Sequence, residues 1–355
     1  MCITKHQNST KYSDKKPLVS FCLLAYNQEK YIKDAVMGAF AQTYSPLEII
    51  ISDDCSTDGT YDVLKTLVTA YRGPHRVKLF KNPKNIGICS HVNLMWQHAG
   101  GEWIFAAAGD DVSSAERVEK VMNLVIHHPK LKLVLSYLNL INDQGNIKGI
   151  NRLGGKLTSQ GTPSFSTWDI NDRIANKAPE SHGACFCYSR ELIDLFDPLP
   201  VGGVHEDNII NWRAELTGDS GILREPLVSY RVHQFQITHT GVTKDLQSFD
   251  NKRIKLIRDG LLTTGQNIKD YNRAKKFIKN GSESDNRILH WLNRREKYCT
   301  SRLRSIMDPW PQRLLQLMII LLMRDEFGTP SLDNFLRSFL PNYVYFTLKK
   351  FKRIN

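Results

Sequence analysis

The sequence lacks the features that mark several large classes of protein. No window of the 355-residue chain has the roughly 18 consecutive apolar residues that a membrane-spanning helix needs. The polar segment before residue 17 has no apolar signal-peptide core, so we expect a cytoplasmic protein. The chain also lacks the Gly-x-Gly-x-x-Gly turn of dinucleotide-binding oxidoreductases after its first strand, and the Gly-Lys-Ser/Thr loop of phosphate-loop hydrolases.

Cysteine is sparse, and its pattern indicates neither a disulfide framework nor a metal site. The seven cysteines are scattered and odd in number, and Cys185 and Cys187 are two residues apart, which is not a metal-site spacing. Free thiols in a reducing cytoplasm are the simplest account.

Positive charge is in excess but unevenly distributed. The net charge is +12, and from Asp245 onward 22 Lys and Arg residues stand against 11 Asp and Glu residues. A basic C-terminal region favours an anionic partner, either a lipid surface or a nucleic acid. Because no aromatic and basic binding motif accompanies this charge, we expect no nucleic-acid partner.

Apolar strands alternate with amphipathic helices through the first half of the chain. Strands are expected at 18–26, 47–52, 77–80, 102–107 and 131–140, with helices at 29–42, 60–71, 88–98, 113–127, 189–196 and 206–216. This alternation predicts an α/β fold with a mainly parallel, doubly wound sheet. Asn27 is expected to cap the helix at 29–42, and Ser113 and Glu116 are expected to form a capping box. The polar segment around 150–180 is expected to be irregular. From about residue 246 the pattern is helical and basic, and the largely apolar ten-residue segment 314–323 suits a buried or interfacial helix.

The most informative segment is the apolar run that ends at Gly109, Asp110 and Asp111. Two adjacent carboxylates repel each other unless a cation or hydrogen-bond donors lie beside them, and a hard divalent cation holding a diphosphate would meet that need. The alternative is an Asx turn in which the two acids cap the next helix.

Polar residues follow two other strands as well. The first strand ends at Ala25, Tyr26 and Asn27, and the second ends in the acidic run from Asp53 to Gly59. The carboxyl ends of parallel strands share one crevice, and a nucleotide would fit there because carboxylates accept hydrogen bonds from a base or a ribose. The run from Ser56 to Asp58 can also be read as a simple helix N-terminus.

Together these segments resemble the family 2 glycosyltransferases, inverting enzymes with the GT-A fold, over about residues 17–240. The matching segments are 17–27, 41–44, 50–60, 85–87, 109–111 and 206–207. The resemblance implies a polar tail at 1–16, a GT-A domain at 17–240 and a helical basic region at 241–355. Within the domain, 17–112 would form the nucleotide-binding half and 113–240 the acceptor half.

The resemblance assigns expected roles to individual residues. The expected donor is a UDP-sugar, and its nucleotide would be bound by Ala25, Tyr26, Asn27, Glu29, Asp53, Asp54, Asn85, Gly87, Gly109 and Asp110. Either Asp53 or Asp54 would hold the base. Asp110 takes the metal position of the family's Asp-x-Asp motif, whose first acid is replaced by Ala108. Mn²⁺ or Mg²⁺ would be bound by Asp110 with help from Asp111 or His233.

Further residues are expected to act on the acceptor and on the phosphates. By resemblance Asp207, with Glu206 beside it at the start of a helix, is the general base, and the N-terminal helix dipole would hold the pair ionised. A pair of helix caps is the alternative. Arg213, Arg231 and His233 are the candidates for phosphate or acceptor contact, and Arg213 could orient Asp207 or be a solvated charge.

The expected acceptor is a glycan or a polyprenyl-diphosphate-linked glycan in cell-surface polysaccharide synthesis. The basic C-terminal region could bind the anionic inner face of the plasma membrane, pair two subunits as a homodimer, or form a solvated cap. Apolar residues 314–323 beside Arg313, Arg324 and the basic run 349–353 favour the membrane. The rival hypothesis is a non-catalytic protein on the same fold that binds nucleotide sugars or carbohydrates, which the missing acid at Ala108 suggests.

Overall fold

A computed structural model describes residues 16–151, 153, 161–162, 164–180, 182–233, 246–276, 282–307 and 312–323. Within them the first half of the chain alternates strands with helices, as expected. Its strands are β1 (Val19–Ala25), β2 (Leu47–Asp53), β3 (Arg76–Lys81) and β4 (Trp103–Ala108), and its helices are α1 (Ile32–Phe40), α2 (Thr60–Ala70), α3 (Ile88–His98) and α4 (Arg117–His127).

The second half of the domain adds strands to the same sheet. They are β5 (Val112–Ser113), β6 (Leu131–Ile141), β7 (Ile147–Asn151), β8 (Gly161–Thr162), β9 (Phe165–Trp168), β10 (Cys187–Ser189) and β11 (Asp219–Arg231). Between them lie α5 (Ile170–Ile174), the 3₁₀ turn η1 (Gly183–Cys185), α6 (Glu191–Asp194) and α7 (Glu206–Thr217). The segment around 150–180, expected to be irregular, therefore contributes β7, β8, β9 and α5.

The described strands run in the order β3-β2-β1-β4-β10-β6-β11-β9-β8, with β5 on β11 and β7 on β6. Neighbouring strands from β3 to β4 are parallel, and β10 is antiparallel to both β4 and β6. The chain moves outward from β1 to β3 and then returns to the other side of β1 at β4. The loops that follow β1 and β4 therefore lead away from each other at the carboxyl ends of these strands, and open α/β sheets bind their ligands at such a point.

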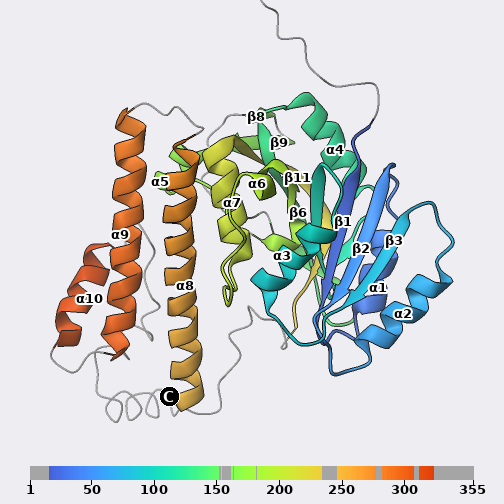
Figure 1. The fold of residues 1–355 in the computed structure, drawn as a ribbon, viewed down its shortest axis with the longest axis horizontal. Helices are drawn as coiled ribbons and strands as arrows, with labels where there is room; N and C mark the ends of the chain where they lie inside the picture. Colours follow the sequence, from blue (N-terminus) through green and yellow to red (C-terminus); the bar gives the residue numbers. More distant parts are fainter. Residues whose placement is uncertain are drawn as a thin grey trace, which may run out of the picture.

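Helices cover both faces of the sheet because its strands are apolar on both sides. Phe21 and Leu23 of β1 pack with the apolar residues of α1, α2 and α4, whereas Cys22, between them, packs with those of α3 and α7. Successive side chains of a strand point to opposite faces, so this alternation produces the two layers. Figure 1 shows the sheet with α3 on one face and α1 and α2 on the other.

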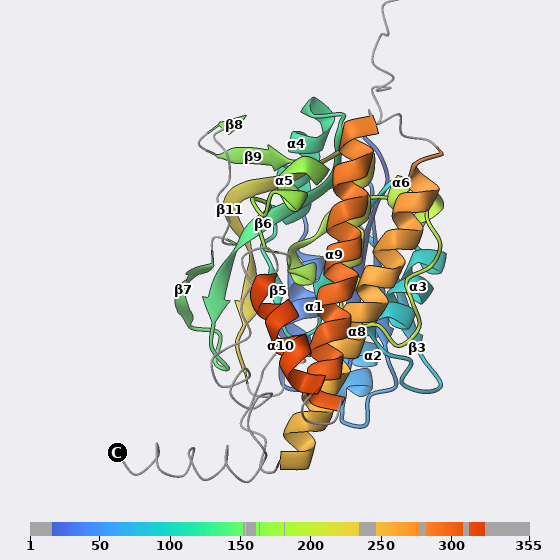
Figure 2. The ribbon, with the colours of Figure 1, turned by 90° about the vertical axis from the view of Figure 1, so that its left-hand side faces the viewer.

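Two long helices and a shorter one follow the sheet domain: α8 (Leu246–Ala274), α9 (Ser282–Met307) and α10 (Gln312–Leu322). α8 packs against α7, α9 against α8 and α10 against α9, and Figure 2 shows the three helices from their outer side. The indole of Trp212 on α7 stacks on that of Trp291 on α9 at 5.4 Å and donates to the backbone carbonyl of Asn267 on α8. The described part of this region is thus helical, as expected, and it packs on the sheet domain through a shared apolar core.

None of the helices in the described ranges is long and apolar enough to cross a membrane. The largely apolar segment 314–323 lies mostly in α10, where Ile320 is buried while Leu315 and Met318 are 60% and 61% exposed. The basic run 349–353, Arg324 and the expected domain boundary at 240 lie outside the described residues.

Two helix starts differ from the sequence-based expectation. We expected Asn27 to cap a helix starting near Glu29, but α1 begins at Ile32 and Asn27 has a φ of 52°. We also expected Ser113 and Glu116 to form a capping box, but Ser113 lies in β5 and its hydroxyl accepts a hydrogen bond from Arg117. The side chain of Asn27 instead accepts a hydrogen bond from Thr57, 30 residues away, and the backbone of Ser113 pairs with Val228 of β11.

Candidate active site

The carboxyl ends of β1 and β4 meet at the point where the strand order reverses, and both carry expected site residues. Tyr26, which follows β1, is 44% exposed, whereas Ala25 is buried in the core and can offer only its backbone. Gly109, which follows β4, donates its N–H to the carbonyl of Leu24 at 2.9 Å. A Cβ on Gly109 would lie 2.4 Å from the side-chain oxygen of Gln28, so a larger residue here would require the Gln28 side chain to move.

The acidic loop after β2 is held together by its own polar side chains. Asp53 is completely buried, and its carboxylate accepts hydrogen bonds from the backbone and hydroxyl groups of Ser56. The side-chain oxygen of Asn27 accepts from the N–H of Thr57 at 2.8 Å, and the Glu29 carboxylate accepts from the N–H of Gly59 at 3.0 Å. Asn27 and Glu29 therefore join the ends of β1 and β2 into one wall.

Asp54 holds the turn that leads into α3. Its carboxylate accepts from the side-chain amide of Asn82 at 2.7 Å and from the N–H groups of Ile86 and Gly87, each at 3.0 Å. Asn85 remains exposed at the tip of this turn. Both carboxylates are buried and accept hydrogen bonds from protein groups, and the expectation that Asp53 or Asp54 holds the base stays a prediction. Their role in the structure is to shape the loops at the crevice.

Asp110 and Asp111 have different surroundings although they are adjacent. The Asp110 carboxylate lies 3.0 Å from Nε2 of His233, and the His233 ring packs on Tyr31 with ring centroids 4.8 Å apart. Asp111 instead accepts a hydrogen bond from the backbone N–H of Arg231 at 2.8 Å. Burial, reinforced by the charge of Asp110, raises the pKa of Asp111 well above its usual value.

The two members of this acid pair therefore have separate functions. Asp110 faces His233, and Asp111 anchors the end of β11. This corrects the expectation that Asp111 contributes to the metal shell.

Arg231 braces this corner from behind. Its guanidinium donates to the carbonyl groups of Asp110, Asn142 and Asp143 at 2.9, 3.1 and 3.2 Å, and to the carboxylate of Asp34 at 3.1 Å. The residue is only 1% exposed. The expectation that Arg231 contacts phosphate is corrected, since its donors are directed into the protein.

The pair of Asp110 and His233 has the donor chemistry that a divalent cation needs. Mg²⁺ keeps several water or phosphate ligands and takes as few as one or two from the protein. With bonds of about 2.1 Å, neighbouring ligands of an octahedral ion lie about 3 Å apart, which is the separation of this pair. The described residues contain no group of three or more His, Cys, Asp or Glu side chains that could hold a metal ion by itself. The arrangement thus fits a cation that completes its shell with diphosphate and water.

The second acidic pair opens α7. The side chains of Glu206 and Asp207 are partly buried, and Asp207 accepts from the N–H of Asn208 at 2.7 Å. Burial, with the charge of Asp207 second, raises the pKa of Glu206 to about 8. Burial also raises the pKa of Asp207, against the opposing effect of the Asn208 N–H and of His205 and His182. The expectation that the helix dipole keeps both ionised is corrected, since burial outweighs it.

His182 links the start of α7 to the end of β11. Burial lowers the pKa of His182, and the negative charge of Asp207 opposes this shift. The His182 ring meets the Tyr230 ring edge-on, with ring centroids 5.7 Å apart. Tyr230 directly precedes Arg231 in β11 and lies three residues before His233. The structure therefore connects Asp207 with the corner that carries Asp110.

Arg213 does not belong to this group. It is completely buried, donates to Asp270 of α8 at 2.7 and 3.2 Å, and donates to the carbonyl of Asp197. Arg213 comes six positions after Asp207 in α7, so it lies about 240° around the helix axis from Asp207. The expectation that Arg213 orients Asp207 or contacts the acceptor is corrected, and this ion pair instead joins α7 to α8.

Two contributors could not have been found from the sequence. Tyr31 packs on His233 and donates its hydroxyl to Asp143 at 2.8 Å. Asp259 of α8 accepts from the N–H of Val204 at 2.6 Å and lies 3.0 Å from Nε2 of His205. Tyr31 and Asp143 are 112 residues apart, and Asp259 lies more than 50 residues from the loop it holds, so no local pattern signals either contact.

Comparisons with known proteins agree with this geometry. The sequence profile described as "Glycosyl transferase family 2" matches residues 20–196. EpsE of Bacillus subtilis, a glycosyltransferase by name, is 30% identical over 151 residues, which are 41% of this chain and 53% of that protein. TuaG of the same organism, named for teichuronic acid biosynthesis, is 33% identical over 111 residues, or 31% of this chain and 43% of that protein. The matched part thus spans about half the length of these relatives.

A solved structure is similar in fold. The crystal structure of S. aureus TarS 1-349 in complex with UDP has a TM-score of 0.56 at 16% sequence identity, covering 90% of this chain and 80% of that one. At this identity the similarity concerns the fold alone.

Proposed function

Because the chain belongs to the family 2 glycosyltransferases, we propose that it transfers a sugar from a nucleoside-diphosphate sugar to an acceptor hydroxyl, with inversion at the anomeric carbon. The observation that carries the proposal is the pair of Asp110 and His233 at the reversal point of the sheet, connected to the acidic start of α7. One site thus combines groups for a diphosphate with groups for a proton.

The donor would lie across the carboxyl ends of β1, β2 and β4. Exposed Tyr26 and Asn85 border this surface, and Asp53 and Asp54 set the shape of the loops below it. The similarity in fold to TarS, which was crystallised with UDP, supports a UDP-sugar as the donor. Asp110 and His233 would hold Mg²⁺ or Mn²⁺, which when bound supplies positive charge against the departing diphosphate.

Asp207 would act as the general base. The acceptor oxygen attacks the anomeric carbon, the bond from that carbon to the diphosphate breaks, and the hydroxyl proton passes to the Asp207 carboxylate. A raised pKa suits this step because a base works best when its pKa approaches the working pH. Burial raises the pKa of both Glu206 and Asp207, and the two neighbouring carboxyl groups titrate as a coupled pair that can share one proton near neutral pH.

We place the reaction in the synthesis of a cell-surface polysaccharide, which the name of TuaG supports. The acceptor would be a glycan or a lipid-linked glycan at the inner face of the membrane. Exposed Leu315 and Met318 on α10, with Lys297 and Arg304 of α9 beside the same helix, support peripheral contact with an anionic surface.

The test is donor binding by the full chain. A panel of nucleotide sugars is titrated with Mg²⁺, with Mn²⁺ and with a chelator, using the wild type and Asp110→Asn. We expect one donor class to bind, with cation-enhanced affinity in the wild type and a weaker enhancement in Asp110→Asn. A wild-type chain that binds no nucleotide sugar would refute the proposed function, and an unchanged enhancement in the variant would refute the role of Asp110.

A further inference from the structure

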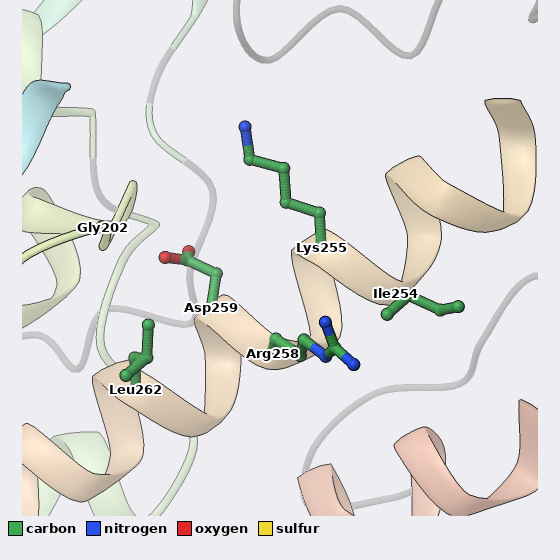
Figure 3. Close-up of a pocket in the computed structure, with 6 residues that line it drawn as sticks. All are labelled: Gly202, Ile254, Lys255, Arg258, Asp259 and Leu262. Carbon is green, nitrogen blue, oxygen red and sulfur yellow. The ribbon is translucent and has the colours of Figure 1, made fainter. Parts of the chain in front are cut away.

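A hollow of about 230 Å³ lies between α8 and the loop that leads into α7. It is lined by Gly202, Ile254, Lys255, Arg258, Asp259 and Leu262, which Figure 3 shows. Complete binding sites for drug-sized molecules measure about 300–1,000 Å³, so this hollow suits one group of a larger ligand. Gly202 has a φ of 82°, and nothing lies within 4 Å of the place where its Cβ would be, so the loop leaves the hollow open on that side.

Two positively charged side chains line this hollow, and they extend from α8 in different directions in Figure 3. Lys255 and Arg258 are exposed, and they come from neighbouring positions on one helix. Asp259, the acid in the same wall, is only 3% exposed and is engaged by the Val204 N–H and by His205. In Figure 3 its carboxylate points toward the loop that carries Gly202. The two cations thus face solvent while the carboxylate is turned into the protein.

The hollow also has apolar walls. Ile254 is partly buried and Leu262 is 44% exposed. A ligand with an anionic group next to an apolar part would cover both kinds of surface.

The hollow lies near the start of α7, which carries the candidate base. Asp259 binds Val204 and His205, the two residues directly before Glu206 and Asp207. Asp207 comes three positions after Val204, and a chain of that length spans at most about 11 Å. A ligand in the hollow could therefore reach Asp207 with a hydroxyl group carried by a short stretch of sugar.

We propose that Lys255 and Arg258 bind a phosphate group of the acceptor, an inference that rests on the proposed sugar transfer to a hydroxyl at Asp207. Phosphate offers several acceptor oxygens to an ammonium and a guanidinium group. It can come from a lipid phosphate, whose chain would contact Ile254 and Leu262, or from a phosphate within a water-soluble glycan. The hollow then selects acceptors by charge, on the side of Asp207 that faces α8.

The test measures the affinity of the full chain for phosphate probes. Dodecyl phosphate below its micelle concentration represents the lipid source, glycerol 3-phosphate the water-soluble source, and dodecyl maltoside an uncharged amphiphile. The variant is Lys255→Gln with Arg258→Gln. The matched control is Lys269→Gln with Lys276→Gln, which removes two exposed charges from the same helix region outside the hollow.

We expect the hollow variant to bind a phosphate probe roughly 5- to 25-fold more weakly than the wild type, as two partly solvated ion pairs allow. The control variant should stay within about twofold, and dodecyl maltoside should not distinguish the proteins. Stronger binding of dodecyl phosphate than of glycerol 3-phosphate would identify the lipid source, and the reverse order the soluble one.

Three results would overturn the proposal: no phosphate probe binds the wild type, both double variants lose affinity equally, or the maltoside binds as well as the phosphate. Nucleotide-sugar binding, measured in parallel, separates this outcome from failure of the proposed function. Both double variants should bind the donor like the wild type, because neither changes the carboxyl edge of the sheet.

Discussion

Replacing Asp207 by Asn should remove the proton acceptor while preserving the shape of the α7 start. The Asn side chain keeps an oxygen that can accept the N–H of Asn208, which Asp207 accepts at 2.7 Å. A positioned base contributes about 10²- to 10⁴-fold to rate, which corresponds to about 3–5 kcal/mol of transition-state stabilisation. Because burial brings the pKa of Asp207 closer to neutral pH, we expect a loss in the upper half of that range.

The matched variant is Glu206→Gln. With a pKa of about 8, Glu206 is mostly protonated at pH 7, and Gln is close to the shape of a neutral Glu. Turnover at pH 7 should therefore fall less than about tenfold. The two substitutions change neighbouring carboxyl groups of one helical turn, so their difference isolates the base from the local structure.

The assay follows release of nucleoside diphosphate from the donor found in the binding panel, with and without acceptor, between pH 5 and 9. In the wild type, kcat should rise with pH as Asp207 loses its proton, at a pH above the usual range of an aspartate. This acidic limb should disappear in Asp207→Asn. Wild-type turnover in Asp207→Asn, or equal losses in the two variants, would refute the assignment.

Three further predictions follow from the same contacts. Glu206→Gln should raise the free energy of unfolding in urea by up to about 3 kcal/mol at pH 7. The reason is that the folded carboxyl holds its proton up to about pH 8, while the unfolded one loses it near 4.5. A stability difference between variant and wild type that does not increase from pH 4.5 to pH 8 would contradict the burial of this group. Arg231→Met should cost about 3 kcal/mol or more, because three carbonyl groups lose their donor at about 1–3 kcal/mol for each buried group; an unchanged urea midpoint would show that Arg231 is no brace. Leu315→Glu with Met318→Glu should weaken binding to anionic vesicles about tenfold in a flotation assay, since it places charge on the exposed apolar face of α10; equal flotation would exclude α10 as the contact.

The local pattern of the sequence predicted most of the sheet domain. The helix expected at 88–98 is α3 with the same bounds, and the one expected at 60–71 is α2 with one residue fewer. Both have an apolar face with helical spacing, which depends only on neighbours along the chain. The helix expected from residue 29 begins instead at Ile32, because Asn27 and Glu29 bind the loop after β2.

The candidate site was predicted in its place but less well in its contacts. Asp110 and His233 were both expected near a cation, and the structure brings them within 3.0 Å across 123 residues of sequence. Asp54, Arg213 and Arg231 were expected to contact ligands, and in the structure each of them binds other groups of the protein. A charged side chain in a motif can serve a ligand or the fold, and only the position of its partners decides between them.

The sequence by itself determined the alternation of strands and helices, the acidic residues at the strand ends and the basic character of the C-terminal region, because each depends on residue type and local spacing. Tertiary structure alone decided which acids remain available. It buried Asp53, separated Asp110 from Asp111, raised the pKa of Glu206 to about 8 and brought α8 against the loop before Asp207. These outcomes depend on desolvation and on partners far away in the chain, which no local pattern contains.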